Sequence, residues 1–577
     1  MPTNFLNRIL TQLEESKTRF GRGEAAKAER LLATLSRRVF TDTASLLRLH
    51  EAALFLRAFP HSPSVLRSAE RILLSMPGRI GRLRARGADM SVFEDFDGSG
   101  VAGTTMQDTL GFDVARWLVR RLPGDVEIAW DEYDDERAMG EIWPRLLPLL
   151  EEDAYVEANI PWRQWLLSAR GIGHDLQWLI RSFENLPIGE RERAELYNQL
   201  RLPLRWKVND FRFSRSGNWE SPREIFYHRE PLITRNQVHL LKELDRPSPK
   251  LKRLTRSRGE EVMTKIREVM AVRYRELYGT TLGDPNSVLR FDAARGVVMY
   301  LWNLPPDRRL PLRAYVAGCT LKNGVPINYI EAIGICEWME VGFNTFYTFR
   351  NGETAWIYAQ SLRFLLAMTG AKCISIYPYQ IGQNNEEAIE SGAFWFYRKL
   401  GFRPGRRDLL RLTESEEARI ATRKGYRTSP RILKKLAESH VFLELPGSEP
   451  GAWDRFSARQ IGFRVNQRMG SKFGGNSQRI RKKSVDSVAR TLGIQPSRWN
   501  PIERQCLENW SLVLALIPDL NRWPASDKQD LVQIIRAQAG RDEMQYLRLT
   551  QKQQRLRKEL LKLGSNRPSS QKNFRSF

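Results

Sequence analysis

The spacing of apolar residues divides the chain into stretches of different character. Through residues 1–90 apolar positions recur every three to four residues, as on the buried face of an amphipathic helix, and Pro60 and Pro63 interrupt this pattern. Residues 91–250 follow no single spacing and are rich in Trp. These patterns predict a helical N-terminal module over 1–90 and a mixed, partly acidic domain over 91–250, which ends near the basic linker 246–258.

Beyond this linker the pattern indicates a helix over 260–277, followed by short apolar or alternating runs that are typical of strands. Asn323-Gly324 lies between two such runs, and both residues tolerate the positive φ of a tight hairpin turn. The order of elements predicts an α+β domain over 260–445, with a mixed sheet and flanking helices. The expected strands are 296–302, 312–321, 325–333, 339–349, 372–377 and 441–445, and the expected helices are 353–368 and 385–400.

The last part of the chain, residues 451–577, returns to helical spacing. Apolar residues over 500–540 predict a folded helical segment, and 543–564 predicts a long polar helix. Residues 564–577 lack the apolar side chains that a folded segment needs. We therefore expect a mainly helical C-terminal module with a disordered end.

Charge is distributed unevenly over these stretches. The 577 residues include 92 Lys and Arg and 67 Asp and Glu, so the formal net charge is +25. Residues 451–577 hold 25 of the basic residues and 10 of the acidic ones, whereas residues 125–157 hold 12 acids and two Arg. The basic module therefore suits a nucleic acid or an acidic protein partner, and it equally suits docking onto the acidic segment 125–157 of the same chain.

Composition excludes several classes of protein. The 41% of hydrophobic residues excludes a wholly disordered polycation, and four Cys in 577 residues exclude a disulfide scaffold. No apolar run approaches the roughly 18 residues of a membrane-spanning helix, and no apolar secretory segment stands at the start. We expect a cytoplasmic protein without a membrane span.

Candidate chemistry follows the predicted strand 339–349. The loop Arg350-Asn351-Gly352 leads directly into the helix expected from residue 353. A helix N-terminus exposes unpaired N–H groups and the positive end of the helix dipole, which bind phosphate, and Arg350 would add a guanidinium group. A plain connection between a strand and a helix is the alternative interpretation.

The segment SGAFWFYRKLGFRP, residues 391–404, resembles the last motif of the GNAT superfamily, the acetyl-CoA-dependent N-acetyltransferases. That motif has an Ala, a Tyr four residues later, and then Lys-x-Gly-Phe. Here Ala393, Tyr397 and the run from Lys399 to Phe402 match it. The resemblance covers about residues 260–445, and the predicted order of strands and helices agrees with that fold.

This resemblance implies acetyl-CoA or another acyl-CoA as co-substrate. The pantetheine arm would lie between strands 339–349 and 372–377, and the pyrophosphate would rest on the loop after the first of them. The family usually has Arg/Gln-x-x-Gly-x-Gly/Ala in this loop, whereas here the Gly comes one place early and Glu353 replaces the usual Gly. Asn385 either contacts the cofactor or caps the second helix. The implied cofactor-binding residues are Arg350, Asn351, Gly352, Glu353, Thr354, Ala355 and Asn385.

The resemblance also implies a general acid. Tyr397 matches the family's Tyr, whose phenol protonates the departing CoA thiolate, and the alternative is that Tyr397 is a core aromatic residue. Transfer to an amine, which the sequence does not identify, needs a base as well. Glu340 is the first candidate and Glu331 and Glu337 are its rivals, although each could instead be a charge that protects a sheet edge.

Other potentially reactive side chains are weaker candidates for a catalytic role. Cys336 and Cys373 could serve as acyl carriers, but buried small residues are their commoner role. The sequence shows no His, Cys and carboxylate set at metal-ligand spacing, so we expect no metal site.

Two functions from different classes follow. The first is an acyl-CoA-dependent N-acyltransferase that transfers an acetyl group to an amine by direct attack. The second is a non-catalytic protein of the same fold, whose basic C-terminal module contacts nucleic acid or an acidic protein.

Overall fold

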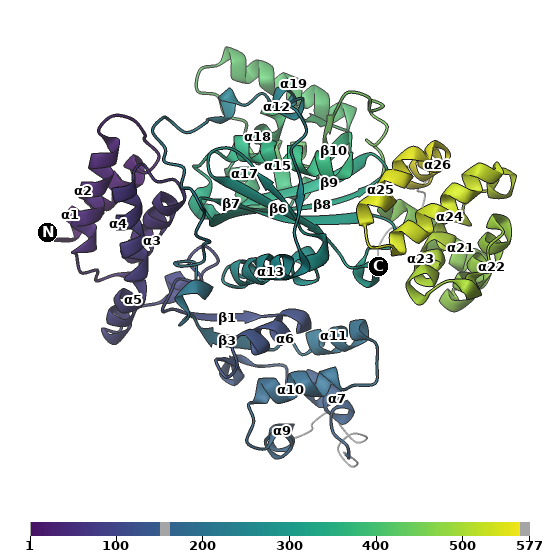
Figure 1. Ribbon diagram of the computed structural model, residues 1–577, viewed down its shortest axis with the longest axis horizontal. Coiled ribbons are helices and arrows are strands. Elements are labelled where there is room, and N and C mark those ends of the chain that lie inside the picture. The colour runs from purple at the N-terminus through teal and green to yellow at the C-terminus, as the bar shows by residue number, and fades with distance from the viewer. Residues whose placement is uncertain (1, 150–161, 566–577) are drawn as a thin grey trace.

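A nine-stranded mixed sheet forms the centre of the molecule (Figure 1). The computed structural model describes residues 2–149 and 162–565, so part of the acidic segment 125–157 and most of the expected disordered end 564–577 lie outside the described residues. The strand order is β11-β12-β10-β9-β8-β7-β6-β5-β4. Strands β9 and β10 are parallel and the other neighbours are antiparallel. The strands are β4 (Lys252–Arg253), β5 (Leu289–Asp292), β6 (Val297–Asn303), β7 (Ala314–Lys322), β8 (Val325–Ile335), β9 (Trp338–Thr345), β10 (Cys373–Ile376), β11 (Arg403–Pro404) and β12 (Val441–Glu444).

The expected α+β class is confirmed, but some element boundaries are wrong. The strand expected over 339–349 is too long, because β9 ends at Thr345 and Tyr347–Phe349 form a short 3-10 helix. The helix expected over 385–400 is two helices, α17 (Glu386–Glu390) and α18 (Ala393–Lys399). Gly392 separates them because its φ of +67° lies in the left-handed region, which ends a helix.

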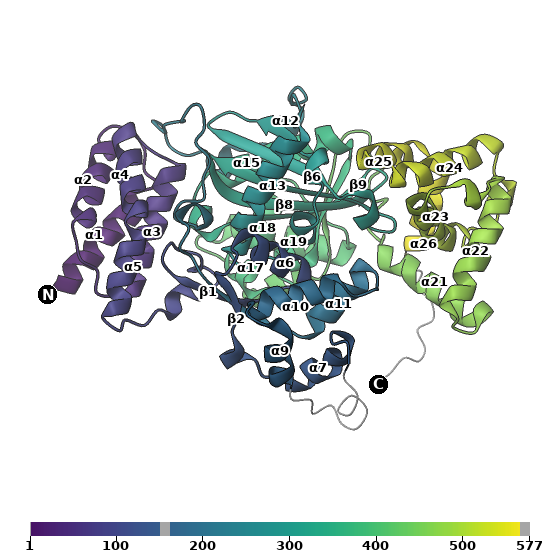
Figure 2. The same ribbon diagram turned by 60° about the horizontal axis from the view of Figure 1, so that its bottom comes forward.

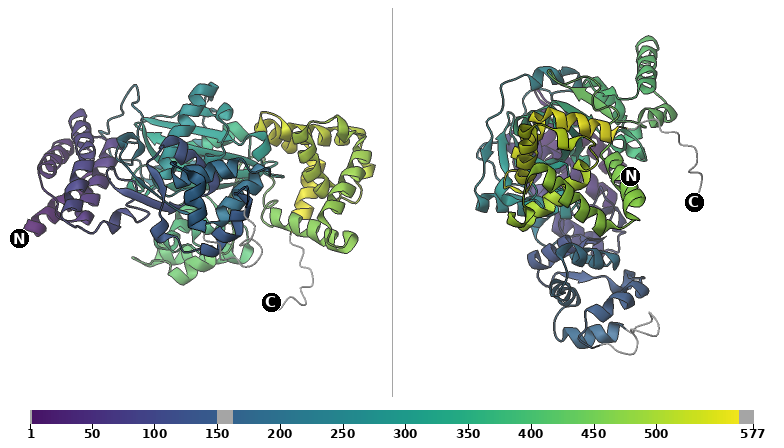
Figure 3. Two further views of the ribbon diagram at one scale, coloured as in Figure 1. Left: turned by 90° about the horizontal axis from the view of Figure 1, so that it is seen from below. Right: turned by 90° about the vertical axis from the view of Figure 1, so that its right-hand side faces the viewer.

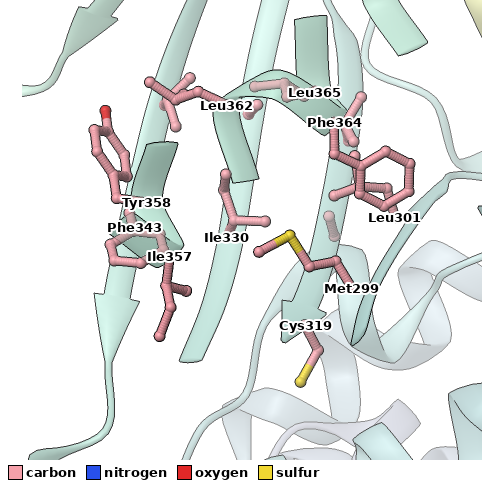
Figure 4. Packing of buried hydrophobic residues seen from close by; sticks show 14 of the residues in the cluster. Met299, Leu301, Cys319, Ile330, Phe343, Ile357, Tyr358, Leu362, Phe364 and Leu365 are labelled. Carbon is pink, nitrogen blue, oxygen red and sulfur yellow. The ribbon is translucent and has the colours of Figure 1, made fainter. Parts of the chain in front are cut away.

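Helices cover both faces of the sheet. Helices α15 (Thr354–Thr369) and α18 lie on one face, and α13 (Arg256–Ala271) lies on the other (Figure 1). Helix α15 is apolar on nearly all sides, which is typical of an enclosed helix. Figure 4 shows side chains of α15 packed toward side chains of the strands: Ile357, Tyr358 and Leu362 toward Met299, Ile330 and Phe343. The remaining helices of this region are α12 (Leu240–Leu244), α14 (Tyr278–Thr281), α16 (Pro378–Ile381), α19 (Arg407–Thr422) and α20 (Pro430–Leu436).

The first 90 residues are helical, as their apolar spacing predicts. Asp42 and Ser62 start two of these helices, because their side chains accept hydrogen bonds from the backbone N–H groups of Ser45 (2.7 Å) and Val65 (3.3 Å). The helices are α1 (Pro2–Ser16), α2 (Glu24–Ser36), α3 (Thr43–Ala58), α4 (Pro63–Leu74) and α5 (Met76–Ala85).

Residues 105–207 form a second hydrophobic core around a small antiparallel sheet of order β1-β3-β2. Trp143, Trp162 and Trp206 are buried in this core, which accounts for the Trp-rich composition. This part lies on the α13 side of the central sheet (Figures 1 and 2). Its elements are β1 (Thr105–Thr109), α6 (Phe112–Arg121), β2 (Val126–Ile128), α7 (Glu136–Ile142), α9 (Trp162–Arg170), α10 (Asp175–Glu184), α11 (Glu190–Gln199) and β3 (Pro203–Lys207).

The C-terminal module lies at the opposite end of the molecule from the N-terminal helices (Figure 3). The single helix expected over 543–564 is wrong: two helices meet at Gln553, whose side chain caps the second. The helices are α21 (Ala458–Phe473), α22 (Ser477–Leu492), α23 (Pro501–Leu514), α24 (Ala525–Ala539), α25 (Glu543–Lys552) and α26 (Gln554–Gly564).

This module docks on the central sheet rather than on the acidic segment. Arg557 donates from Nε to Glu337 Oε1 (2.7 Å), and Gln551 donates to the carbonyl oxygen of Cys336 (3.1 Å). Between the described parts of 125–157 and 451–577 there is no ion pair. In the described chain no helix is long and apolar enough to cross a membrane.

The Asn323-Gly324 turn is confirmed, and its role extends beyond the hairpin. Both residues have positive φ, 48° and 82°, as the turn requires. The buried Asn323 side chain donates to the carbonyl oxygens of Ala58 (2.8 Å) and Phe226 (3.0 Å). The turn therefore joins the central sheet to the N-terminal helices and to the segment around Phe226.

We expect Gly324→Ala to destabilise the fold much more than Gly425→Ala. Both glycines have positive φ, +82° and +81°, so each substitution has the same backbone cost, about 1 kcal/mol. A Cβ at 324 would also lie 2.0 Å from the carbonyl oxygen of Glu220, whereas a Cβ at 425 meets no atom within 4 Å. Urea unfolding measures the difference, and equal costs would contradict the tight approach at the turn.

Candidate functional site

The pairing between the parallel strands β9 and β10 ends partway along β9. Their register pairs Trp338 with Cys373, Met339 with Ile374 and Glu340 with Ser375, and it stops there. Strand β9 then continues to Thr345, while β10 ends at Ile376. We call residues 341–345 of β9, which have no strand partner on the β10 side, together with the end of β10, the gap between the two strands.

Polar side chains border this gap. The Gln380 amide approaches the unpaired part of β9, with Nε2 3.3 Å from the point where a Cβ on Gly342 would stand. Strand alternation places Glu340, Gly342 and Asn344 on one face of β9 and Val341 and Phe343 on the other.

The N-terminus of α15 follows the end of β9 and presents free amides. Among the described residues, no acceptor bonds to the N–H groups of Glu353, Thr354, Ala355 and Trp356. Such amides, together with the positive end of the helix dipole, suit a phosphate group. Thr354 and Ala355 carry two of these amides.

The loop residues before α15 divide into exposed and buried groups. Arg350 and Asn351 are exposed, and the Arg350 guanidinium forms an ion pair with Glu387 of α17. Gly352 allows close packing against the N-terminal module, because a Cβ there would lie 2.8 Å from Cζ of Phe59. Arg350 therefore connects the loop to the helix across from it.

The Glu353 side chain points into the protein interior. Its side chain is 0% exposed and forms ion pairs with Arg295 and with Lys322, whose Nζ lies 3.7 Å away. It also accepts a hydrogen bond from the N–H of Ile233 (3.1 Å). The carboxylate is therefore enclosed in the protein and paired with two cations.

Asn385 is a helix cap, which decides between its two predicted roles. Its Oδ1 accepts from the N–H of Ala388 (3.1 Å), and its Nδ2 donates to the carbonyl oxygen of Tyr379 (3.0 Å). Both ends of the amide are therefore hydrogen-bonded within the protein.

Tyr397 lies on the α15 face of the sheet and is buried. Its ring meets the edge of Tyr358 at a centroid distance of 5.8 Å, and Tyr358 in turn packs against Phe343 of β9 (4.9 Å). Among the described residues the Tyr397 hydroxyl has no hydrogen-bond partner, and burial raises the pKa of this phenol above its usual value. The Tyr397 phenol therefore stays protonated at neutral pH.

Glu340 belongs to a cluster that the sequence did not reveal. Its Oε2 lies 2.8 Å from Nε2 of His440, and its Oε1 lies 3.9 Å from Nη1 of Arg313. The Tyr377 ring stands edge-on to the His440 imidazole at 5.4 Å. A carboxylate and an imidazole in contact can accept a proton from an amine and share it.

The rival candidates have structural partners. Glu337 accepts from the indole of Trp453 (2.7 Å) and pairs with Arg557, so it serves the docking of the C-terminal module. Glu331 accepts from the Tyr315 hydroxyl, and burial raises its pKa. Glu331 lies opposite Gly342 on the same face of the sheet as Glu340, so this face carries two carboxylates.

The cysteines have no reactive surroundings. The thiols Cys319, Cys336, Cys373 and Cys506 are free and buried. Burial raises the pKa of Cys319 to about 12 and also raises the pKa values of the other three, which keeps them protonated. Within residues 2–149 and 162–565 no group of three His, Cys, Asp or Glu side chains could hold a metal ion.

Comparison with known proteins adds no identification. No family model, no curated protein and no solved structure matches this chain.

We expect Glu353→Gln to lower the free energy of unfolding by about 3–5 kcal/mol, because it leaves the buried Lys322 and the half-buried Arg295 without their counter-charge. The matched control is Glu386→Gln, since Glu386 is 69% exposed and pairs with Lys434 on the surface. That control should cost under about 1 kcal/mol. Urea unfolding of both variants measures the contrast, and equal costs would refute the buried cluster.

Proposed function

We propose that the chain is an acyl-CoA-dependent N-acyltransferase of the GNAT type, with acetyl-CoA as the first candidate co-substrate. The observation that carries this proposal is the gap between β9 and β10, followed directly by the free amides of α15. An acyl-pantetheine arm fits between separating strands, and its pyrophosphate fits a helix N-terminus.

The sheet supports the same proposal. Antiparallel strands β6 to β9, the parallel neighbour β10 and the antiparallel pair β12 and β11 stand in the order that the resemblance implies. The motif residue Tyr397 lies on α18, which packs on α15 through the Tyr358 ring. The resemblance to the GNAT superfamily depends mainly on a short motif. The sheet topology around that motif is a separate argument for the same proposal.

The reaction follows from the groups on the two faces. The amine nitrogen attacks the thioester carbon, an N–C bond forms, and the C–S bond breaks. The nitrogen proton passes to the Glu340–His440 pair on one face, and the Tyr397 hydroxyl protonates the thiolate from the other face. The gap between the strands is where the two faces meet.

We expect acetyl-CoA to bind and Tyr397→Phe to lower turnover by about 10²–10⁴-fold, with affinity for CoA changed only a few-fold, because a general acid acts in the transition state. Calorimetry measures binding. Release of free thiol in the presence of amino acids, amino sugars, polyamines and peptides measures turnover.

Tyr358→Phe is the control for this experiment. Tyr358 is also buried, and its hydroxyl has no partner among the described residues. It should keep turnover within a few-fold of the unmodified protein. Absence of binding for acetyl-CoA and longer acyl-CoAs at millimolar concentration would refute the enzyme, whereas binding without thiol release from any amine would favour a non-catalytic protein.

A second candidate function is supported by the C-terminal module. On α22 the side chains Arg479, Lys482 and Lys483 are exposed, and none forms an ion pair with a described residue. Adjacent cations without partners at the start of one helix suit a polyanion, and nucleic acid is the form we propose.

Replacement of Arg479, Lys482 and Lys483 by Gln should weaken binding of RNA or duplex DNA and reduce its salt dependence by about one unit of slope for each phosphate that is no longer neutralised. Fluorescence anisotropy at several salt concentrations measures both quantities. The control removes three exposed cations that do have acidic partners: Arg137, Arg191 and Arg522. Equal weakening in the two triple variants would show that only net charge matters.

A further inference from the structure

A small cavity lies at the end of β9 and is rich in arginine. Its volume is about 90 Å³, enough for several waters or one small anion. Arg215, Arg273, Arg275 and Arg350 line it, and so does Asn344 of β9. Asn344 shares its face of the strand with Glu340, and Arg273 and Arg275 follow α13 on that same side. Part of the cavity wall therefore lies on the Glu340 face of β9, and Arg350 of the loop before α15 forms another part.

Arg273 is the unusual group in this cavity. It is 6% exposed, and within the described chain no carboxylate lies within ion-pair distance of it. Its contacts are a hydrogen bond from Nη1 to the carbonyl oxygen of Val269 (3.0 Å) and the Phe346 ring, 4.3 Å from the guanidinium carbon. Burial lowers its pKa to about 9. A buried cation without a counter-ion is costly, so its retention calls for a negative partner.

The neighbouring groups do not neutralise it. Glu51 pairs with Arg215, whose side chain is 4% exposed and whose Nε has no hydrogen-bond partner. Arg275 lies over the Phe96 ring at 3.6 Å and has no carboxylate partner in the described residues. Two carboxylates also line the cavity.

These two carboxylates leave the positive charge in excess. Glu387 is paired with Arg350, and among the described residues Asp97 forms no ion pair with Arg273 or Arg275. Arg273 and Arg275 therefore remain as cations without a counter-ion at the cavity wall.

We propose that this cavity binds a carboxylate or phosphate group and that, in the acyltransferase proposed above, this group belongs to the amine acceptor rather than to CoA. The second part rests on the proposed function, whereas the first does not. Because Glu340 and Asn344 are four residues apart on one face of β9, the anion and the reacting amine would be about 13 Å apart. The acceptor is then an extended molecule with an amine at one end and an anionic group at the other.

Arg273→Met tests the anion site with inorganic phosphate and acetate as probes. The unmodified protein should melt at a higher temperature as either anion is added, because the anion binds only the folded state. Arg273→Met should weaken this binding about tenfold or more, yet should melt no lower than the unmodified protein without anion, since it removes an uncompensated buried charge. Arg275→Gln, a half-buried position, provides a second variant and should also weaken binding.

Arg191→Met is the matched control, because Arg191 is 89% exposed and paired with Glu195, and it changes the net charge equally. It should keep the full response to anions. An unchanged response in both Arg273→Met and Arg275→Gln would overturn the site.

Competition with CoA separates the two parts of the proposal. Phosphate that stays bound while CoA binds supports an acceptor subsite, and Arg273→Met then leaves the affinity for CoA unchanged. Displacement of phosphate by CoA, with CoA binding weakened by Arg273→Met, would overturn the assignment to the acceptor. A third outcome is that Arg273→Met abolishes anion binding while no variant binds acyl-CoA. This outcome would support the anion site and refute the acyltransferase.

Discussion

The buried carboxylate of Glu353 holds together segments that are distant in the sequence. It neutralises Lys322 at the end of β7 and Arg295 just before β6, and it accepts the N–H of Ile233. Because α15 begins at the next residue, the position of the free amides depends on this contact. Charges taken out of water need close partners, so a displacement of the first turn of α15 would leave Lys322 and Arg295 without their counter-charge.

The candidate site follows from a topological constraint. A sheet that changes from antiparallel to parallel pairing at β9 and β10 needs a crossover, and α15 provides it. The crossover brings a helix N-terminus to the end of the strand that lines the gap. The N-terminal module then covers this loop through Phe59 and Gly352, so the chain encloses the region from a side that the sheet alone would leave open.

Local signals in the sequence were sufficient for part of this structure. The Asn323-Gly324 turn, the helix from 354 and the strands that precede it follow from local conformational preference and apolar spacing. The break at Gly392 shows the limit of such local signals. The sequence does not reveal whether a glycine within a helical pattern has a helical or a left-handed φ. Tyr397 was proposed as a general acid from a sequence motif alone, without any information on the residues that surround it in the fold.

The remaining groups of the site could not be predicted, because their partners are far away in the chain. His440 lies 100 residues from Glu340, and Glu353 lies 58 residues from Arg295. Whether a carboxylate points into a cavity or into a buried ion pair depends on which segments pack beside it. For the same reason the sequence did not reveal that the Glu353 side chain lies in the interior.

The contacts between the C-terminal module and the turn before β9 bear on the order in which the chain folds. The N–H of Cys336 donates to the Thr550 hydroxyl, a contact across 214 residues of sequence. At about 5–20 residues per second, a ribosome adds such a length in roughly 10–40 s. During synthesis the contacts between this turn and the C-terminal module can therefore form only after the last helices have been made, well after β8, β9 and β10.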